Sequence, residues 1–150
     1  MLQLHHRAEN LPFLDGTFAC VAAFLCDPFL GLDFVSECYR VLQSGGVLFG
    51  SSPSLTWGKP LRDSIGIDLL TTRFISKGGE EVRVASHLFS EAQIIDMLAQ
   101  AGFPLANVKV TSHCLPPTSK DVSPDITRAL SAPSQDVLQL PILTLFSAKR

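Results

Sequence analysis

Two short apolar segments, separated by the length of one helix, constrain the fold of this chain most strongly. Residues 18–24 form a continuous run of small and apolar side chains, which is typical of a strand buried on both faces. Residues 47–49 form a second such run, and residues 28–42 between them place apolar side chains at helical spacing. Two strands joined by a helix form a crossover unit in which the strands are parallel. The sequence therefore predicts an α/β fold.

Local signals predict where the helices begin and end. Asp27 is expected to cap the first helix, with Pro28 at the first helical position, where its missing N–H has no cost. Gly45-Gly46 is expected to end that helix, because glycine readily adopts the left-handed conformation of a C-terminal cap. Ser90 and Gln93 have the spacing of a capping box, which predicts a second helix that closes at Gly102.

The other segments give weaker patterns. Residues 65–75 are expected to form a helix, and residues 81–85 a short exposed strand. Residues 108–110 are a strand candidate, and residues 142–148 are expected to form a buried closing strand because their apolar side chains alternate little.

Two further segments complete the expected domain. Leu2 and Leu4 alternate with polar residues as in a short strand, and residues 115–135, with four prolines, are expected to form a long loop. A strand follows this loop, so residues 1–150 are expected to form a single domain.

The charge and hydropathy patterns exclude several classes of partner. The net charge is −2, from 12 basic and 14 acidic residues without a long run of one sign, which argues against binding to nucleic acid or anionic lipid. The most apolar segment, residues 18–32, is too short to span a bilayer, and the N-terminus lacks the pattern of a secretion signal. We therefore expect a cytoplasmic protein without a membrane segment.

The four cysteines do not have the spacing of a metal site. Cys20, Cys26, Cys38 and Cys114 form no CxxC pair. Three of them lie on segments expected to be buried, where a free cysteine behaves as a small hydrophobic residue. We expect core packing, and no metal site.

Four segments, in order, resemble one enzyme family. The first is the run from Ala8 to Phe18, which contains Leu-Pro-Phe, and the second is Glu37 with Arg40-Val41-Leu42 and the following Gly45-Gly46. The third is the helix start Phe89-Ser90-Glu91 with Ala101-Gly102-Phe103 at the end of that helix. The fourth is the apolar strand that ends in Ala148-Lys149-Arg150. Together they resemble the C-terminal two-thirds of a class I S-adenosylmethionine-dependent methyltransferase of the ubiquinone/menaquinone-biosynthesis type. The resemblance implies a partial Rossmann-like fold, with a mostly parallel sheet and an antiparallel C-terminal strand.

The resemblance also implies S-adenosylmethionine as cofactor and two groups of residues that contact it. The loop after the family's third strand, which faces the adenine, corresponds to Arg7, Ala8 and Glu9. The end of its fourth strand, which faces the methionine part, corresponds to Ala22, Ala23 and Phe24. Arg7 stands where the family usually has Asp, so Glu9 would have to accept the hydrogen bond of the adenine amino group.

The family's glycine-rich cofactor turn precedes these segments and has no counterpart in the sequence. Gly45-Gly46 cannot replace it, because such a ligand binds at a helix N-terminus and this pair is expected to end a helix. Two hypotheses stay open, and with them whether the chain is an enzyme. It is a methyltransferase for a small apolar acceptor whose cofactor cradle is completed from elsewhere, or a non-catalytic remnant that serves as an interaction module.

No residue is assigned as catalytic. The four histidines, His5, His6, His87 and His113, are candidate bases, although a surface or hydrogen-bonded role is simpler for each. Trp57 and Phe74 are candidates for the wall of an acceptor pocket, and core packing explains them equally well.

Without the family's first strands, residues 18–24 would form an exposed sheet edge with unpaired backbone groups. The segment from Met1 to His5, a second copy of the chain, or another polypeptide could pair there. We expect a homodimer or a partner protein at this edge.

Overall fold

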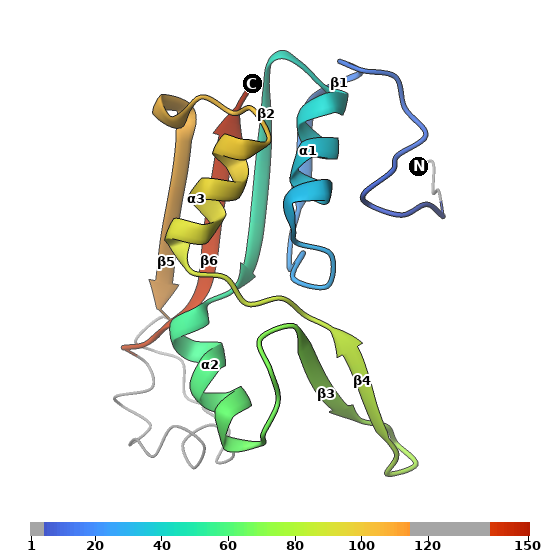
Figure 1. Cartoon of the computed structure of the whole chain (residues 1–150), viewed down its shortest axis with the longest axis vertical. Coiled ribbons are helices and arrows are strands. Elements are labelled where there is room, and N and C mark those ends of the chain that lie inside the picture. Colours follow the sequence, from blue (N-terminus) through green and yellow to red (C-terminus); the bar gives the residue numbers. More distant parts are fainter. Residues whose placement is uncertain (1–4, 115–138) are drawn as a thin grey trace.

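The computed structural model describes residues 5–114 and 139–150 (Figure 1). The strand expected at Leu2 and Leu4 and the loop expected at residues 115–135 lie outside these residues. The elements, in chain order, are β1 Phe18–Ala23, α1 Leu32–Val41, β2 Leu42–Pro53, α2 Leu55–Ser64, β3 Thr71–Ile75, β4 Glu81–Ala85, α3 Glu91–Gln100, the 3-10 turn η1 Leu105–Asn107, β5 Val108–Cys114 and β6 Pro141–Lys149.

The main sheet has the strand order β1-β2-β6-β5. β1 pairs with β2 in parallel, and β6 is antiparallel to both β2 and β5. β1, β2 and β5 therefore run in one direction and β6 in the other (Figure 1). This topology confirms the predicted crossover unit and the predicted mostly parallel sheet with an antiparallel C-terminal strand.

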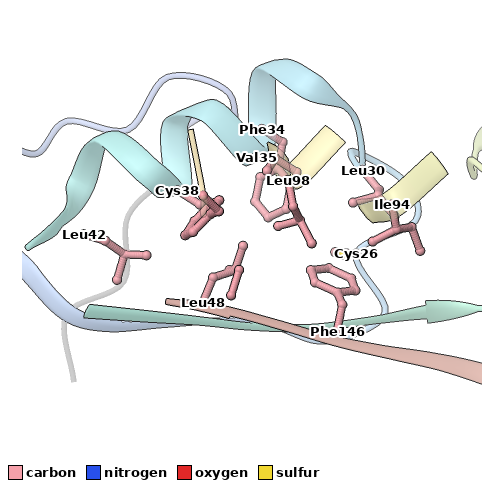
Figure 2. Close-up of a cluster of buried hydrophobic side chains, with 12 residues drawn as sticks. Cys26, Leu30, Phe34, Val35, Cys38, Leu42, Leu48, Ile94, Leu98 and Phe146 are labelled. Atoms are coloured by element: carbon pink, nitrogen blue, oxygen red, sulfur yellow. The ribbon is translucent and has the colours of Figure 1, made fainter. Parts of the chain in front are cut away.

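One face of this sheet carries the core. α1 and α3 lie on it, and Figure 2 shows their apolar side chains meeting those of the strands. Cys38 from α1, Leu98 from α3 and Leu48 from β2 are fully buried. Burial of an aliphatic side chain of this size contributes about 2 kcal/mol, so this contact layer holds both helices to the sheet.

The opposite face of the sheet is not covered by any helix within the described residues. Ala22, Phe49, Ser147 and Lys109 lie side by side on neighbouring strands in this face, and Phe49 is 45% exposed. The expectation that residues 18–24 are buried on both faces is therefore wrong, whereas residues 142–148 are all buried or half-buried. Side chains of β1 and β6 pack against the helices on one face only, and Cys20 is exposed on the other.

β1 forms one edge of the sheet, because β2 is its single strand partner in the described part of the chain. This position was predicted for residues 18–24. The other edge is β5.

The first helix begins later and ends earlier than predicted. Gly31 is its N-cap, because Asp27 and Pro28 belong to a turn in which the Phe29 N–H donates to the Cys26 carbonyl. The Asp27 carboxylate accepts a hydrogen bond from Ser86 instead of capping a helix. α1 ends at Val41, and Gly45 lies within the bend at the start of β2, where it has φ +77°.

The segment between β2 and α3 also differs from the prediction. The helix lies at Leu55–Ser64, where the hydroxyl of the N-cap Ser54 accepts from the Thr56 N–H and Pro60 is tolerated inside the helix. Residues 65–75, predicted to be helical, contain β3, which pairs with β4 in a separate antiparallel hairpin. The strand predicted at residues 81–85 is confirmed and is exposed along its whole length.

α3 agrees with its sequence signals. Ser90 and Gln93 form both hydrogen bonds of the predicted capping box. Gly102 follows the helix with φ +107°, and a Cβ there would lie 3.1 Å from the ring of Tyr39. Glycine is required at this position both by the backbone conformation and by the close approach of the ring.

Glu37 and Arg40 of α1 fasten the segment that leads into β1. The Glu37 carboxylate accepts two hydrogen bonds from Arg40, at 2.7 and 2.8 Å, and one from the Leu11 N–H at 2.6 Å. Arg40 also donates to the carbonyls of Leu11 and Phe13 and to the carboxylate of Asp15. Two of the segments that carry the family resemblance therefore bind each other.

Replacement of Glu37 by Gln is expected to destabilise the fold by about 2 kcal/mol, because the charge-assisted bonds are lost at a side chain that is only 10% exposed. The loss is measured as the free energy of unfolding in urea. Glu80, an exposed residue with no side-chain hydrogen bond in the described structure, is the matched control, and its Gln variant is expected to match the wild type. Equal stability of both variants would contradict this role.

The contact between Glu37 and Arg40 also predicts that the free energy of unfolding depends on pH. The hydrogen bonds from Arg40 lower the pKa of Glu37 below its usual value, with the Leu11 N–H acting in the same direction and burial opposing them. A carboxyl group with a lowered pKa in the folded state adds stability above its unfolded pKa and loses it as the pH falls through the folded pKa. Urea unfolding from neutral pH downward should therefore show an acid loss of stability that is smaller in the Glu37→Gln variant.

The buried thiols are expected to be unreactive in the native protein. Burial raises the pKa of both Cys26 and Cys38 to about 12, so neither forms a thiolate at neutral pH. Cys20 and Cys114 are exposed. Iodoacetamide should therefore label these two cysteines first and all four after denaturation, as followed by mass spectrometry. Native labelling of Cys38 at the rate of Cys20 would show that the core opens.

Candidate functional site

A cavity of about 240 Å³ lies beyond the carboxyl ends of β1 and β2. Asp27, in the turn after β1, and Pro53, the last residue of β2, both line it. The remaining walls come from α2, from β3 and from the segment that follows β4. In open α/β sheets, ligands bind at the carboxyl ends of the parallel strands, so this is the expected position of a ligand site.

The walls of this cavity are mainly apolar. The apolar side chains belong to Trp57, Leu61, Ile65, Phe74 and Leu88. Gly58 allows α2 to approach Leu88 closely, since a Cβ at this position would lie 2.5 Å from a Leu88 methyl carbon. The structure thus brings Trp57 and Phe74, the predicted acceptor-pocket candidates, to the same cavity.

The polar part of the cavity is a hydrogen-bonded series of three residues. Arg62 donates from Nη1 to the Ser86 carbonyl at 2.7 Å and from Nη2 to the Ser86 hydroxyl at 2.6 Å. The Ser86 hydroxyl in turn donates to the Asp27 carboxylate at 2.5 Å. Ser86 therefore fixes the guanidinium relative to Asp27 without direct contact between the two charged groups.

Arg62 is a buried cation that has no direct carboxylate partner in the described part of the chain. Its exposure is 6%, and it forms no salt bridge with any carboxylate in residues 5–114 or 139–150. Burial lowers the pKa of Arg62, while the charges of Asp27 and Asp68 act in the opposite direction. The Asp68 carboxylate itself is turned toward β3, where it accepts from the backbone of Leu70 and Thr71.

A second cavity, of about 320 Å³, lies beside the N-terminal end of α1. Its walls include Phe29, Leu70 and Phe89, and its polar residues are Glu9, Asp33 and His87. Nδ1 of His87 lies 2.7 Å from the Leu30 carbonyl. A carbonyl can only accept, so Nδ1 carries the proton in this contact and Nε2 of the neutral ring is an acceptor.

The two cavities lie on either side of one extended segment. Ser86 and Leu88 line the first cavity, while His87 and Phe89 line the second. The Ser86 and Leu88 N–H groups donate to the carbonyls of Leu70 and Leu69, and the His87 N–H donates to the Asp27 carbonyl. The segment is therefore held on both sides by backbone hydrogen bonds, and its side chains alternate between the cavities.

The residues predicted to contact the cofactor are distributed over several environments. Arg7 is exposed and lies 3.7 Å from Glu9, Ala8 packs against the core, and Glu9 lines the second cavity. Ala23 packs against the core from β1, whereas Ala22 is exposed on the uncovered face of the sheet.

Phe24 is 70% exposed and lines a shallow groove of about 270 Å³ on the uncovered face. Phe49 and Leu145 form the apolar part of this groove, and Lys109 is its charged residue. Glu9 and Phe24 therefore lie in different hollows of the described structure.

The other predicted candidates do not converge on one site. His5 and His6 are exposed, and Nε2 of His113 lies 3.0 Å from the Thr111 hydroxyl on the uncovered face. The sequence analysis did not identify Arg62 and Ser86. The position of Asp27 directly after a strand was the available signal, since the carboxyl end of a parallel strand is where ligands bind.

Comparison with known proteins extends these observations. No family model matches the sequence, and no curated protein matches it. Solved structures do match: a S-adenosylmethionine-dependent methyltransferase from Thermotoga maritima aligns with 97% of this chain and 62% of its own, at 18% identity and a TM-score of 0.59.

Two further solved structures give similar values. A chain of the complex between the Haloferax volcanii Trm112 methyltransferase activator and a methyltransferase has a TM-score of 0.64 at 13% identity, with coverage of 97% of this chain and 59% of its own. Geranyl diphosphate methyltransferase, solved with GPP and sinefungin, has a TM-score of 0.59 at 17% identity, with coverage of 97% and 51%.

This chain thus spans between half and two thirds of the length of these three structures. In residues 5–114 and 139–150, no helix has both the length and the apolar character to cross a membrane. The strand order, the reversed last strand and the structural matches agree, and the chain has the fold of class I S-adenosylmethionine-dependent methyltransferases.

Proposed function

We propose that this chain takes part in methyl transfer from S-adenosylmethionine to a small apolar acceptor. The main support is the fold, because a chain with the sheet order β1-β2-β6-β5 aligns along 97% of its length with a methyltransferase structure. The similarity of residues 8–18 to the ubiquinone/menaquinone-biosynthesis type supports the same assignment.

The acceptor side of the reaction is assigned to the 240 Å³ cavity. Its apolar walls, including Trp57 and Phe74, suit an apolar molecule, and its position beyond β1 and β2 suits transfer at the carboxyl edge of the sheet. One structural neighbour is a geranyl diphosphate methyltransferase, so an acceptor that joins an apolar chain to an anionic group has a precedent in this fold. The chain would contribute by orienting the acceptor and excluding water.

The residues that were expected to bind the methyl donor, S-adenosylmethionine, fit this cofactor only in part. Glu9 supplies a half-buried carboxylate that could accept a hydrogen bond from the adenine amino group, whereas Ala22 and Ala23 face opposite sides of the sheet and do not form one contact surface. Arg7, which lies beside Glu9, competes for that carboxylate. The described residues provide no glycine-rich turn at a helix N-terminus, so we derive no step through the cofactor, and we propose that its cradle is completed by residues outside them.

A non-catalytic role as an interaction module is the alternative. The sheet face that carries Phe24 at 70% and Phe49 at 45% exposure favours it, and so does the edge of β1, which has a single strand partner among the described residues. Both features would serve association with a polypeptide whether or not methyl transfer occurs.

Calorimetry with S-adenosylmethionine and with its demethylated product distinguishes these functions. Binding near micromolar, about 8 kcal/mol, is expected for a methyltransferase. Absence of heat across a millimolar titration would favour the interaction module.

Arg7→Asp is expected to strengthen cofactor binding about fivefold, because it removes the competing cation and adds a carboxylate acceptor, a gain of about 1 kcal/mol. The same calorimetric titration measures the change. Arg83→Asp on the exposed hairpin alters the net charge equally and should leave the affinity unchanged. Equal effects of both variants would mean that the Arg7 loop does not face the cofactor.

We also propose that a second copy or a partner protein covers the β1 edge. The single strand partner of β1 in the described part of the chain and the apolar groove beside it support this proposal. Light scattering at micromolar concentration should then show a mass above that of one chain. A monodisperse, folded monomer would contradict the homodimer.

A further inference from the structure

Arg62 has donor groups that the described structure does not use. Its Nη1 donates to the carbonyls of Ser86 and Asp68, and its Nη2 donates once, to the Ser86 hydroxyl. A guanidinium has five N–H donors, so the Nε–H and one Nη2–H have no hydrogen bond to any described residue. These two groups form one edge of the guanidinium, which matches the two oxygens of a carboxylate.

The surroundings of this edge favour an anion. Arg62 lines the 240 Å³ cavity and is 6% exposed, so its charge is largely removed from water, with no direct counter-ion in residues 5–114 or 139–150. A buried charge is costly unless it is paired, and a carboxylate that enters the cavity would supply the missing pair. The apolar walls around Trp57 and Leu88 would cover the rest of the molecule.

Asp27 fixes the orientation of the Arg62 guanidinium and limits the affinity of the cavity for an anion. Its carboxylate accepts from the Ser86 hydroxyl, which fixes that hydroxyl as an acceptor for Arg62 and keeps the guanidinium in place. Its negative charge also lies close enough to the cavity to oppose a second anion. Removal of this charge with retention of the acceptor oxygen should therefore strengthen anion binding.

We propose that this cavity binds a small apolar carboxylic acid, with the carboxylate on the free edge of the Arg62 guanidinium and the apolar body against Trp57. The assignment of this acid as the methyl acceptor rests on the proposed function. The binding of the acid does not, because it needs neither the cofactor nor methyl transfer.

The fluorescence of Trp57 provides the test, since the chain has one tryptophan and it lines the cavity. Phenylacetate and phenylacetamide are the probes, because they have the same size and differ in charge. Titration of the whole chain with phenylacetate is expected to change the Trp57 emission, with at least tenfold tighter binding than phenylacetamide. Equal affinities, or no response to millimolar phenylacetate, would overturn the proposal.

Variants locate the anion site. Arg62→Gln should abolish the preference for the acid, Arg62→Lys should retain part of it, and Asp27→Asn should tighten acid binding severalfold without changing amide binding. Lys59 is the matched control, because it is an exposed cation on the same helix that pairs with Asp63, and Lys59→Gln should have no effect. Circular dichroism establishes that each variant is folded.

If Arg62→Gln does not fold, Arg62→Lys and Asp27→Asn decide the question. An unchanged acid affinity in folded Asp27→Asn, together with an unchanged preference in Arg62→Lys, would place the anion elsewhere. Acid binding without any heat from S-adenosylmethionine would support this site and contradict the proposed methyl transfer. Binding of S-adenosylmethionine without a preference for phenylacetate over phenylacetamide would support the proposed methyl transfer and contradict this anion site.

Discussion

The bidentate pair between Glu37 and Arg40 determines how the chain enters the sheet. Both side chains belong to α1, yet their hydrogen bonds reach Leu11, Phe13 and Asp15, about 25 residues earlier. The segment before β1 is thereby fixed to the helix that follows β1, and the crossover unit is closed by polar contacts as well as by the core. β1, which this segment leads into, pairs with β2, and Asp27 in the turn after β1 lines the cavity.

The helices pack on one face of the sheet, which stabilises the fold and leaves apolar side chains on the other face partly exposed. α1 and α3 bury Leu48 and Phe146 against one face, and this contact layer contains the two buried thiols. On the other face, Phe49 and Leu145 are covered only in part, by neighbouring strand residues. Within the described residues, one layer of helices therefore covers one face of the sheet, and the second face carries partly exposed apolar side chains.

Sequence reasoning identified the elements that local patterns specify. The crossover unit and the α3 capping box follow from short-range signals, and the antiparallel C-terminal strand followed from the family resemblance. It failed where an apolar segment joins a hairpin, as in β3, because strand pairing depends on a partner about ten residues away.

The candidate site was predictable only in part, for the same reason. Trp57 and Phe74 were identified as possible wall residues from their type. Arg62 was not, because its contact with Ser86 spans 24 residues and that of Ser86 with Asp27 spans 59, and no local pattern encodes such distances. The exposed side of β1 was also missed, since an apolar run does not indicate whether a second layer covers it.

The extended segment from Ser86 to Phe89 acts as a shared partition between two chambers. Alternate side chains face opposite compartments, and the backbone is anchored on both flanks, so it cannot shift toward one without withdrawing from the other. The same four residues therefore shape both chambers, and a substitution that changes the path of this segment would alter the two walls together.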